Sequence, residues 1–344
     1  MKSKIIFKTV AAAVILAVGA VSLTAIASER DVIKIYGADD DVLGQFDASQ
    51  VSYLQFEEEI DYPNAEVDKN GNIIIMLSPE VKFKMIKVDA YTDLGWTRSE
   101  WTYYRLRGED MVNSVWNSDT REKRIYPFYF GEFVVTQDIC KSVTGKNMIV
   151  QSGWEDQLPV GDNYPAIVDS WNDIVIGDNC FLAKINTMLT AIKQNNPSVA
   201  ELLGDKEFRL PSEWEWEYAA SGGMNWESVL YYFSGTSQSS LAAAQTVAVV
   251  DAESIAPVGT KLPNVLGLYD MSGNINEWCS GLGYPGHEET PGYLHDNGDW
   301  SDSERPARGG NYAFGMWQLN QCVVSYRYYE CVDMGMEVGF RLAL

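Results

Sequence analysis

Hydrophobic and polar residues alternate over short distances in the first third of the chain. Two strand-like stretches, residues 65–67 and 73–76, flank an Asn70-Gly71 pair, and this arrangement is typical of a hairpin with a tight turn. We expect residues 28–117 to form a small β-rich N-terminal region. The acidic runs at 39–41 and 57–59 are interpreted as solvated faces.

Helical spacing replaces this pattern after Arg121. Residues 126–135 have the pattern of a strand. Thr136 then precedes three apolar residues at helical spacing, Ile139, Cys140 and Val143, and Gly145 ends the segment. This pattern predicts a short helix with a cap at each end. Ser170 and Asp173 resemble a capping box that opens a second helix, whose apolar side is Ile174, Phe181 and Ile185. Cys140 and Cys180 are expected to face the core.

A third helix is predicted after Ser212, which lies three residues before Glu215. Its apolar stripe is Trp216, Ala219 and Ala220, and Gly222-Gly223 ends it. From Gly235 onward the chain is rich in Gly, Asn, Asp and aromatic residues, which favours long ordered loops and no helix longer than a turn or two. A few short helices with broken β-structure indicate an α+β fold.

The N-terminus has the pattern of an export signal. Lys2, Lys4 and Lys8 precede an apolar run from Val10 to Ala20, and residues 25–27 supply small-x-small. We predict a signal peptide at 1–27, cleaved before Ser28, and an exported protein in the periplasm, at the cell surface or secreted. The alternative is an uncleaved anchor, because residues 10–27 are long enough to span a bilayer.

Charge and composition exclude several classes of function. The net charge is −22, which repels phosphate backbones and anionic lipid, so nucleic acid is not an expected partner. Two histidines, His287 and His295, are too few for a histidine relay. The cysteines are odd in number and none forms a C-x-x-C pair, so a zinc or thioredoxin-type site has no support.

Several ordered motifs carry a family resemblance. Residues 209–220 (RLPSEWEWEYAA), 264–278 (NVLGLYDMSGNINEW), 308–310 (RGG), 339–343 (GFRLA) and 130–137 (FGEFVVTQ) resemble the motifs of the formylglycine-generating enzyme, or sulfatase-modifying factor, family. The resemblance implies a C-type-lectin-like domain over residues 118–344. In that fold, two short helices surround a small twisted sheet, and the N- and C-terminal strands of the domain pair.

The resemblance also implies a possible metal site. The family often holds a calcium ion on the segment that corresponds here to Asp270, Met271, Gly273, Ile275 and Glu277, and carboxylate and carbonyl oxygens are suitable ligands. The alternative is that Asp270 and Glu277 cap backbone amides without a metal. No other cofactor is expected.

The catalytic residues of the family are missing. The enzymes bind copper with two cysteines five residues apart that precede an A-A-R sequence. With that sequence anchored on Arg327, the two positions are Leu319 and Val324, which offer no thiolate for a soft metal. Cys322 and Cys331 are nine residues apart, and a bond between them would be a structural clip. We therefore expect a non-catalytic protein.

The segment 312–329 contains six aromatic residues in eighteen positions. Aromatic side chains supply large contact area with few torsions to freeze, and methionine adapts to irregular partners. The alternative is that these rings form the core of the last strands, but no clean apolar alternation supports it. We therefore interpret most of them as exposed binding residues.

Residues 308–344 also resemble the variable region of proteins diversified by retroelements. Such regions begin near R-G-G, carry a core like the CVVSYR at 322–327, and end at G-F-R. The resemblance and the side-chain character together predict these ligand-binding residues: Tyr312, Phe314, Met316, Trp317, Gln321, Tyr326, Tyr328, Tyr329, Glu330, Val332, Asp333, Met334, Met336 and Glu337.

The leading functional hypothesis is an exported monomer that binds a macromolecule without catalysis. The expected ligand is a protein on a host or bacterial surface. The alternatives are an oxidase acting on sulfatases, or another chemistry on the same fold, and a structural component of the envelope.

Overall fold

The computed structural model describes the backbone of six N-terminal strands and most of the chain beyond residue 61. The described ranges are 3–9, 15–18, 21–28, 32–36, 42–47, 52–58, 62–89, 126–147, 158–225, 229, 231–281, 304–326, 328–331 and 337–344. The chain divides into two compact units, Met1–Asp61 and Tyr62–Leu344, and each is described by itself. No helix among these residues is long and apolar enough to cross a membrane.

The first unit is built from antiparallel strands. β1 (Ser3–Thr9) pairs with β6 (Ser52–Glu58). A four-stranded sheet has the order β2-β3-β4-β5, with these bounds: β2 Ile15–Val18, β3 Val21–Ser28, β4 Val32–Tyr36 and β5 Val42–Asp47. Strands therefore occupy residues 3–9, 15–18 and 21–28, within the range where the sequence predicts a cleaved signal peptide, and the cleavage stays a prediction.

The second unit opens with an antiparallel sheet of order β10-β9-β8-β7. Its strands are β7 (Asn64–Val67), β8 (Ile73–Met76), β9 (Lys82–Val88) and β10 (Phe128–Gly131). β7 and β8 form the hairpin expected around Asn70-Gly71. Because β9 pairs with β10, residues 62–89 belong to the same unit as the lectin-like domain, and the boundary expected at 118 does not separate them.

The end of the chain closes this unit. The amide of Tyr129 donates to the carbonyl of Leu344 at 3.0 Å, the amide of Leu344 donates back at 2.9 Å, and Gly131 donates to Leu342 at 2.9 Å. The expected pairing of the first and last strands of the domain is thus present. A second sheet has the order β13-β12-β11-β14, with these bounds: β11 Asn276–Trp278, β12 Glu304–Arg308, β13 Tyr328–Cys331 and β14 Val338–Phe340.

The first helix, α2 (Gln137–Thr144), lies where the sequence predicts it, between Thr136 and Gly145. Its N-terminal cap differs from the expectation, because Thr136 makes no side-chain capping bond. The first two amides, of Gln137 and Asp138, instead donate to the carbonyls of Tyr164 and Asp162. A neighbouring loop therefore satisfies donors that a side chain was expected to satisfy.

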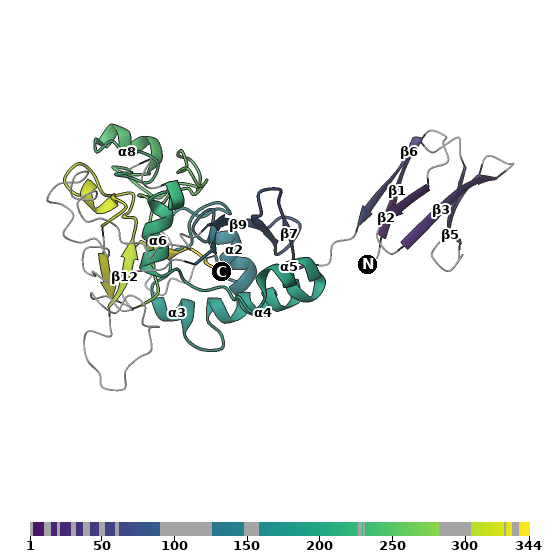
Figure 1. Cartoon of the computed structure of the whole chain (residues 1–344), viewed down its shortest axis with the longest axis horizontal. Coiled ribbons are helices and arrows are strands. Elements are labelled where there is room, and N and C mark those ends of the chain that lie inside the picture. Colours follow the sequence, from purple (N-terminus) through teal and green to yellow (C-terminus); the bar gives the residue numbers. More distant parts are fainter. Residues whose placement is uncertain are drawn as a thin grey trace. The chain divides into compact units, whose positions relative to one another are not determined.

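The second predicted helix is two helices, so the prediction of one was wrong. α3 (Trp171–Val175) is capped by Ser170 and ends at Ile176, whose backbone is extended, and α4 (Phe181–Asn195) begins after Cys180. α5 (Pro197–Leu203), capped by the Asn196 side chain, was not predicted. These helices follow one another along one side of the unit (Figure 1).

The third predicted helix is confirmed as α6 (Glu213–Ala220), with a complete capping box between Ser212 and Glu215. η4 (Gly223–Asn225) follows it, and α8 (Leu241–Val247) begins after the capping side chain of Ser240. The largest cluster of buried side chains packs α2, α3, α4 and α5 against both sheets.

Candidate functional site

Two buried ion pairs connect the elements beneath the C-terminal segment. The Glu277 carboxylate accepts from Arg341 at 2.7 and 3.0 Å and from the indole N–H of Trp216 at 2.8 Å. Arg341 also donates to the carbonyls of Gly131, Glu132 and Tyr269. Arg341, Glu277 and Trp216 are fully buried, so the guanidinium fixes β14 to β10 and to the loop that precedes β11.

The second ion pair joins the start of the C-terminal segment to α6. Arg308 donates to Glu217 at 2.6 Å, lies 3.8 Å from Glu213, and places its guanidinium 5.2 Å from the centre of the Trp216 ring. Both charges of the close pair are fully buried. Breaking such a pair by removing one partner leaves an unpaired buried charge, which costs about 3–5 kcal/mol. The arginines of the R-G-G and G-F-R motifs are therefore structural.

The loop at 311–318, called here the Trp317 loop, is held by backbone hydrogen bonds on both sides. Tyr312 donates its amide to Asn274 at 3.0 Å and accepts from the amide of Ala252 at 3.0 Å, and the Phe314 carbonyl accepts from Asp251 at 3.2 Å. A turn then closes where Gln318 donates to Gly315 at 2.9 Å. Met316 and Trp317 occupy the two central positions of that turn.

Exposure separates the expected binding residues into two groups. Trp317 is 94% exposed, Met316 69% and Tyr328 38%. The second group is half-buried: Tyr312, Phe314, Gln321, Tyr326, Glu330 and Glu337. Val332, Asp333, Met334, Met336 and the side chain of Tyr329 lie outside the described residues. The expected exposure is therefore found at the loop tip and at Tyr328.

The half-buried aromatics support the loop from below. Phe314 and Tyr326 pack against the buried cluster that contains Phe233, Val247 and Leu319. The Tyr312 hydroxyl donates to Glu337 at 2.7 Å, and burial together with this acceptor raises the pKa of Tyr312 to about 12. The packing of Tyr312, Phe314 and Tyr326 is therefore closer to the alternative, in which these rings form core, than to full exposure.

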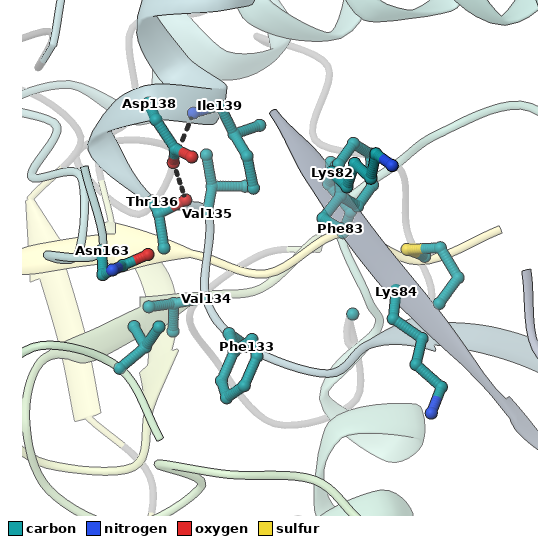
Figure 2. A pocket seen from close by; sticks show the side chains of 14 residues that line it. Lys82, Phe83, Lys84, Phe133, Val134, Val135, Thr136, Asp138, Ile139 and Asn163 are labelled. Carbon is teal, nitrogen blue, oxygen red and sulfur yellow. Dashed lines mark hydrogen bonds between the residues drawn. The ribbon is translucent and has the colours of Figure 1, made fainter. Parts of the chain in front are cut away.

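A cavity of about 100 Å³ lies between β9 and the chain from 131 to 139. Figure 2 shows Val134, Val135 and Ile139 along one wall, with β9 carrying Lys82, Phe83 and Lys84 opposite. The Thr136 hydroxyl donates to Asp138, whose carboxylate also accepts from the amide of Ile139 at 2.8 Å (Figure 2). Sequence reasoning missed this cavity because its walls come from distant segments.

The family model "Sulfatase-modifying factor enzyme 1-like domain" matches residues 46–344. The chain belongs to this family.

Individual relatives give the extent of the similarity. "Chaperone protein LppX" of Paenibacillus barcinonensis is 28% identical over 62% of this chain and 79% of its own length. The formylglycine-generating enzyme of Streptomyces coelicolor is 32% identical over 39% of this chain and 46% of its own length. Among solved structures, Treponema denticola variable protein 1 matches with a TM-score of 0.50 at 23% identity, covering 77% of this chain and 96% of that protein. This likeness shows the lectin-like fold of the sulfatase-modifying factor family.

Glu277, one of the expected calcium residues, is engaged by neighbouring side chains, and the calcium site as a whole stays a prediction. The oxygens of Glu277 are taken by Arg341 and Trp216, and the described residues contain no group of three or more His, Cys, Asp or Glu side chains that could hold a metal. Glu277 is therefore an ion-pair partner of Arg341, a role that neither the calcium prediction nor the backbone-amide alternative specified.

Asp270 fits a metal better than Glu277 does. One of its oxygens accepts from the amide of Gly259 at 2.8 Å, while Oδ1 is buried and has no hydrogen-bond partner among the described residues. Burial raises the pKa of Asp270 to about 6. An unsatisfied buried carboxylate oxygen is costly, so Asp270 is the member of the expected set that a calcium ion would satisfy.

The positions anchored to the family's copper cysteines are occupied by buried apolar side chains. Leu319 belongs to the cluster under the Trp317 loop, and Val324 packs in the cluster of α6. Cys322 lies between them, and burial raises the pKa of its thiol to about 12, which opposes formation of the thiolate that binds metals. All five cysteines are unpaired, so Cys322 and Cys331 do not form a clip, and Cys140 and Cys180 are buried as expected.

Proposed function

We propose that this member of the family is an exported, non-catalytic binding protein whose Trp317 loop and neighbouring strand hold a protein ligand on a host or bacterial surface. The observation that carries the proposal is the 94% exposure of Trp317 on a loop tied at both ends to a buried frame. Rigid exposed aromatics supply contact area with little entropy loss on binding. The ordering cost of association is correspondingly reduced.

Binding is tested with labelled protein on bacterial and host cells. Replacing Met316, Trp317 and Tyr328 by alanine should abolish cell binding without a change in melting temperature, since these side chains are exposed. The matched control replaces exposed apolar residues outside the C-terminal segment, Met224, Leu262 and Val265. Equal binding by the wild type and the triple variant would support a structural envelope component instead.

The absence of catalysis rests on Leu319 and Val324. Copper-dependent oxygen consumption with a cysteine-containing sulfatase peptide should stay at the level without protein. The second candidate function, an oxidase that generates formylglycine, is favoured by the 32% identity to the Streptomyces coelicolor enzyme. Measurable turnover would establish that candidate and refute the binding proposal.

Diversification of residues 308–344 is proposed from the resemblance of their motifs. The test lies in the gene neighbourhood, where a reverse transcriptase gene and an imperfect copy of the last codons, differing at adenines, are expected. Without such a copy, the protein would be an undiversified lectin-like binder.

Export and a monomeric state are parts of the same proposal. The N-terminus of the mature protein should be Ser28, which Edman sequencing or mass spectrometry of the exported material determines. An N-terminus at Met1 in a membrane fraction would identify residues 10–27 as an anchor instead. Size-exclusion chromatography with light scattering should give the mass of one chain.

A further inference from the structure

The surroundings of the Trp317 loop carry a distinctive charge pattern. Residues 309–326 contain no charged side chain, and Asp251 and Glu253 are the charged side chains of residues 239–260; Arg327 and Lys261 follow these two stretches directly. Both carboxylates are exposed. Neither forms an ion pair within the part of the chain that the structure describes.

Backbone contacts place these carboxylates beside the loop. Asp251 and Ala252 donate their amides to Phe314 and Tyr312, so the segment 251–253 runs along the loop. A Cβ on Gly315 would lie 2.5 Å from the Asp251 carboxylate oxygen, which shows that this carboxylate lies against the backbone next to Met316. The tip thus combines the 94%-exposed Trp317 ring with at least one adjacent carboxylate that forms no ion pair among the residues that the structure describes.

The two arginines of the R-G-G and G-F-R motifs do not neutralise this surface. Arg308 and Arg341 are buried in ion pairs with Glu217 and Glu277. The whole chain carries a charge of −22, and a field of that sign attracts cationic partners and speeds their encounter. A second copy of this chain would bring the same carboxylates and the same net charge, so self-association through the loop is opposed.

We propose that the Trp317 loop captures a basic segment of a protein partner, an inference that rests on the binding function proposed above. An Arg or Lys side chain of the partner lies on the indole face of Trp317 and pairs with Asp251 or Glu253. An exposed Trp face attracts guanidinium and ammonium groups, while carboxylates beside the loop select for positive charge and against acidic segments. Met316 adapts to the alkyl part of the basic side chain.

The inference is tested with two short fluorescent peptides, one of alternating Arg and Ser and one with Glu in place of Arg, titrated with the full chain and followed by anisotropy. The Arg peptide should bind about tenfold or more tightly than the Glu peptide at low salt. Trp317→Ala should weaken the Arg peptide about fivefold. Asp251→Asn with Glu253→Gln should weaken it and flatten its salt dependence.

The control distinguishes the effect of Asp251 and Glu253 on peptide binding from the effect of the net charge of the chain. Glu201→Gln with Asp205→Asn changes the net charge by the same amount at two exposed positions of another part of the unit, and binding should stay within about twofold. Asn suits position 251, because Asp251 has a φ of +53° and Asn tolerates that conformation. Unchanged melting temperatures show that each variant folds.

Two results would overturn the inference. One is equal weakening by the control pair and by the Asp251/Glu253 pair, which would assign the attraction to net charge alone. The other is cell binding that disappears with Trp317→Ala yet is unaffected by neutralising Asp251 and Glu253. In that second case the binding function stands and only the basic character of the partner is refuted.

Discussion

Single carboxylates in this protein have different roles because their neighbours differ. Glu277 is neutralised by Arg341, one buried oxygen of Asp270 finds no partner in the described part of the chain, and Glu215 caps α6. The residue type alone therefore does not separate an ion-pair partner from a metal ligand or a cap. The partner within hydrogen-bonding distance makes that distinction.

Glu215 should contribute a pH-dependent part of the stability. Burial alone would raise the pKa of Glu215, but the hydrogen bonds and charge of Arg209, with the bonds from Ser212, lower it below the usual 4.5. A lowered folded-state pKa stabilises the protein above the unfolded value, and this contribution is lost as the pH falls through the folded value. Glu215→Gln should cost about 1 kcal/mol at pH 7, because Arg209 is partly exposed.

Urea unfolding at neutral and at acidic pH measures this effect. The difference between the wild type and Glu215→Gln should shrink once the pH lies well below 4.5. A difference of equal size at both pH values would mean that the charge of Glu215 contributes nothing beyond its hydrogen bonds.

Asp270 is the residue through which calcium should act. Calcium should raise the melting temperature of the wild type, EDTA should reverse the rise, and Asp270→Asn should remove it. A ligand at 100 times its Kd stabilises the folded state by about 2.7 kcal/mol. The Glu201→Gln variant, altered at an exposed position, should respond to calcium as the wild type does. If EDTA leaves the melting temperature of the wild type unchanged, the prediction of a calcium site is refuted.

At the scale of elements, the backbone at Gly310 lies in close contact with residues 321 and 322. A Cβ on Gly310 would lie 2.5 Å from the Cys322 sulfur and 2.9 Å from the Gln321 carbonyl oxygen, and Gly310 has a φ of +73°. The turn after β12 thus presses directly on η6 (Leu319–Cys322). This contact sets how far the Trp317 loop, which joins the two, can move.

Gly310→Ala should therefore lower the free energy of unfolding by more than the cost of placing alanine at a positive φ. The matched variant is Gly145→Ala, at a φ of +85° with nothing within 4 Å of the added Cβ. Gly145→Ala should cost about 1–2 kcal/mol, and Gly310→Ala more, because the cysteine sulfur and a carbonyl must move. Equal losses of unfolding free energy would show that the turn and η6 adjust freely.

At the scale of the whole molecule, residues 62–344 form a compact unit with its own closure. β9 joins the sheet of β10, and the last three residues pair with Arg209 and β10. The family match itself begins at residue 46. The boundary of the folding unit thus lies well before the first motif that the resemblance recognises, at residue 130.

A chain shortened to residues 62–344 should fold with the melting temperature of the full chain. A chain shortened to 118–344, the domain limits expected from the motifs, removes β7, β8 and β9 and should melt far lower or fail to fold. Circular dichroism melting of the two proteins compares them. Equal stability of the shorter chain would show that the β7–β9 strands are dispensable.

Local signals in the sequence determined the elements whose stabilising partners lie within a few residues. The capping box of Ser212 and Glu215 and the hairpin at Asn70-Gly71 were predictable for this reason. The motifs of the family supplied the fold, including the pairing of β10 with the end of the chain. The tip of the Trp317 loop could be recognised by its aromatic character, although not by its geometry.

Tertiary structure alone decided the features whose partners are far apart along the chain. It placed β9 beside β10, packed Phe314 and Tyr326 beneath a loop that exposes Trp317, and paired Glu277 with Arg341, 64 residues away. Long-range pairing depends on which surfaces remain unburied after the local elements form, and no short window of sequence contains that information. For the same reason, the carboxylates of Asp251 and Glu253 became part of the candidate site only once the loops were placed together.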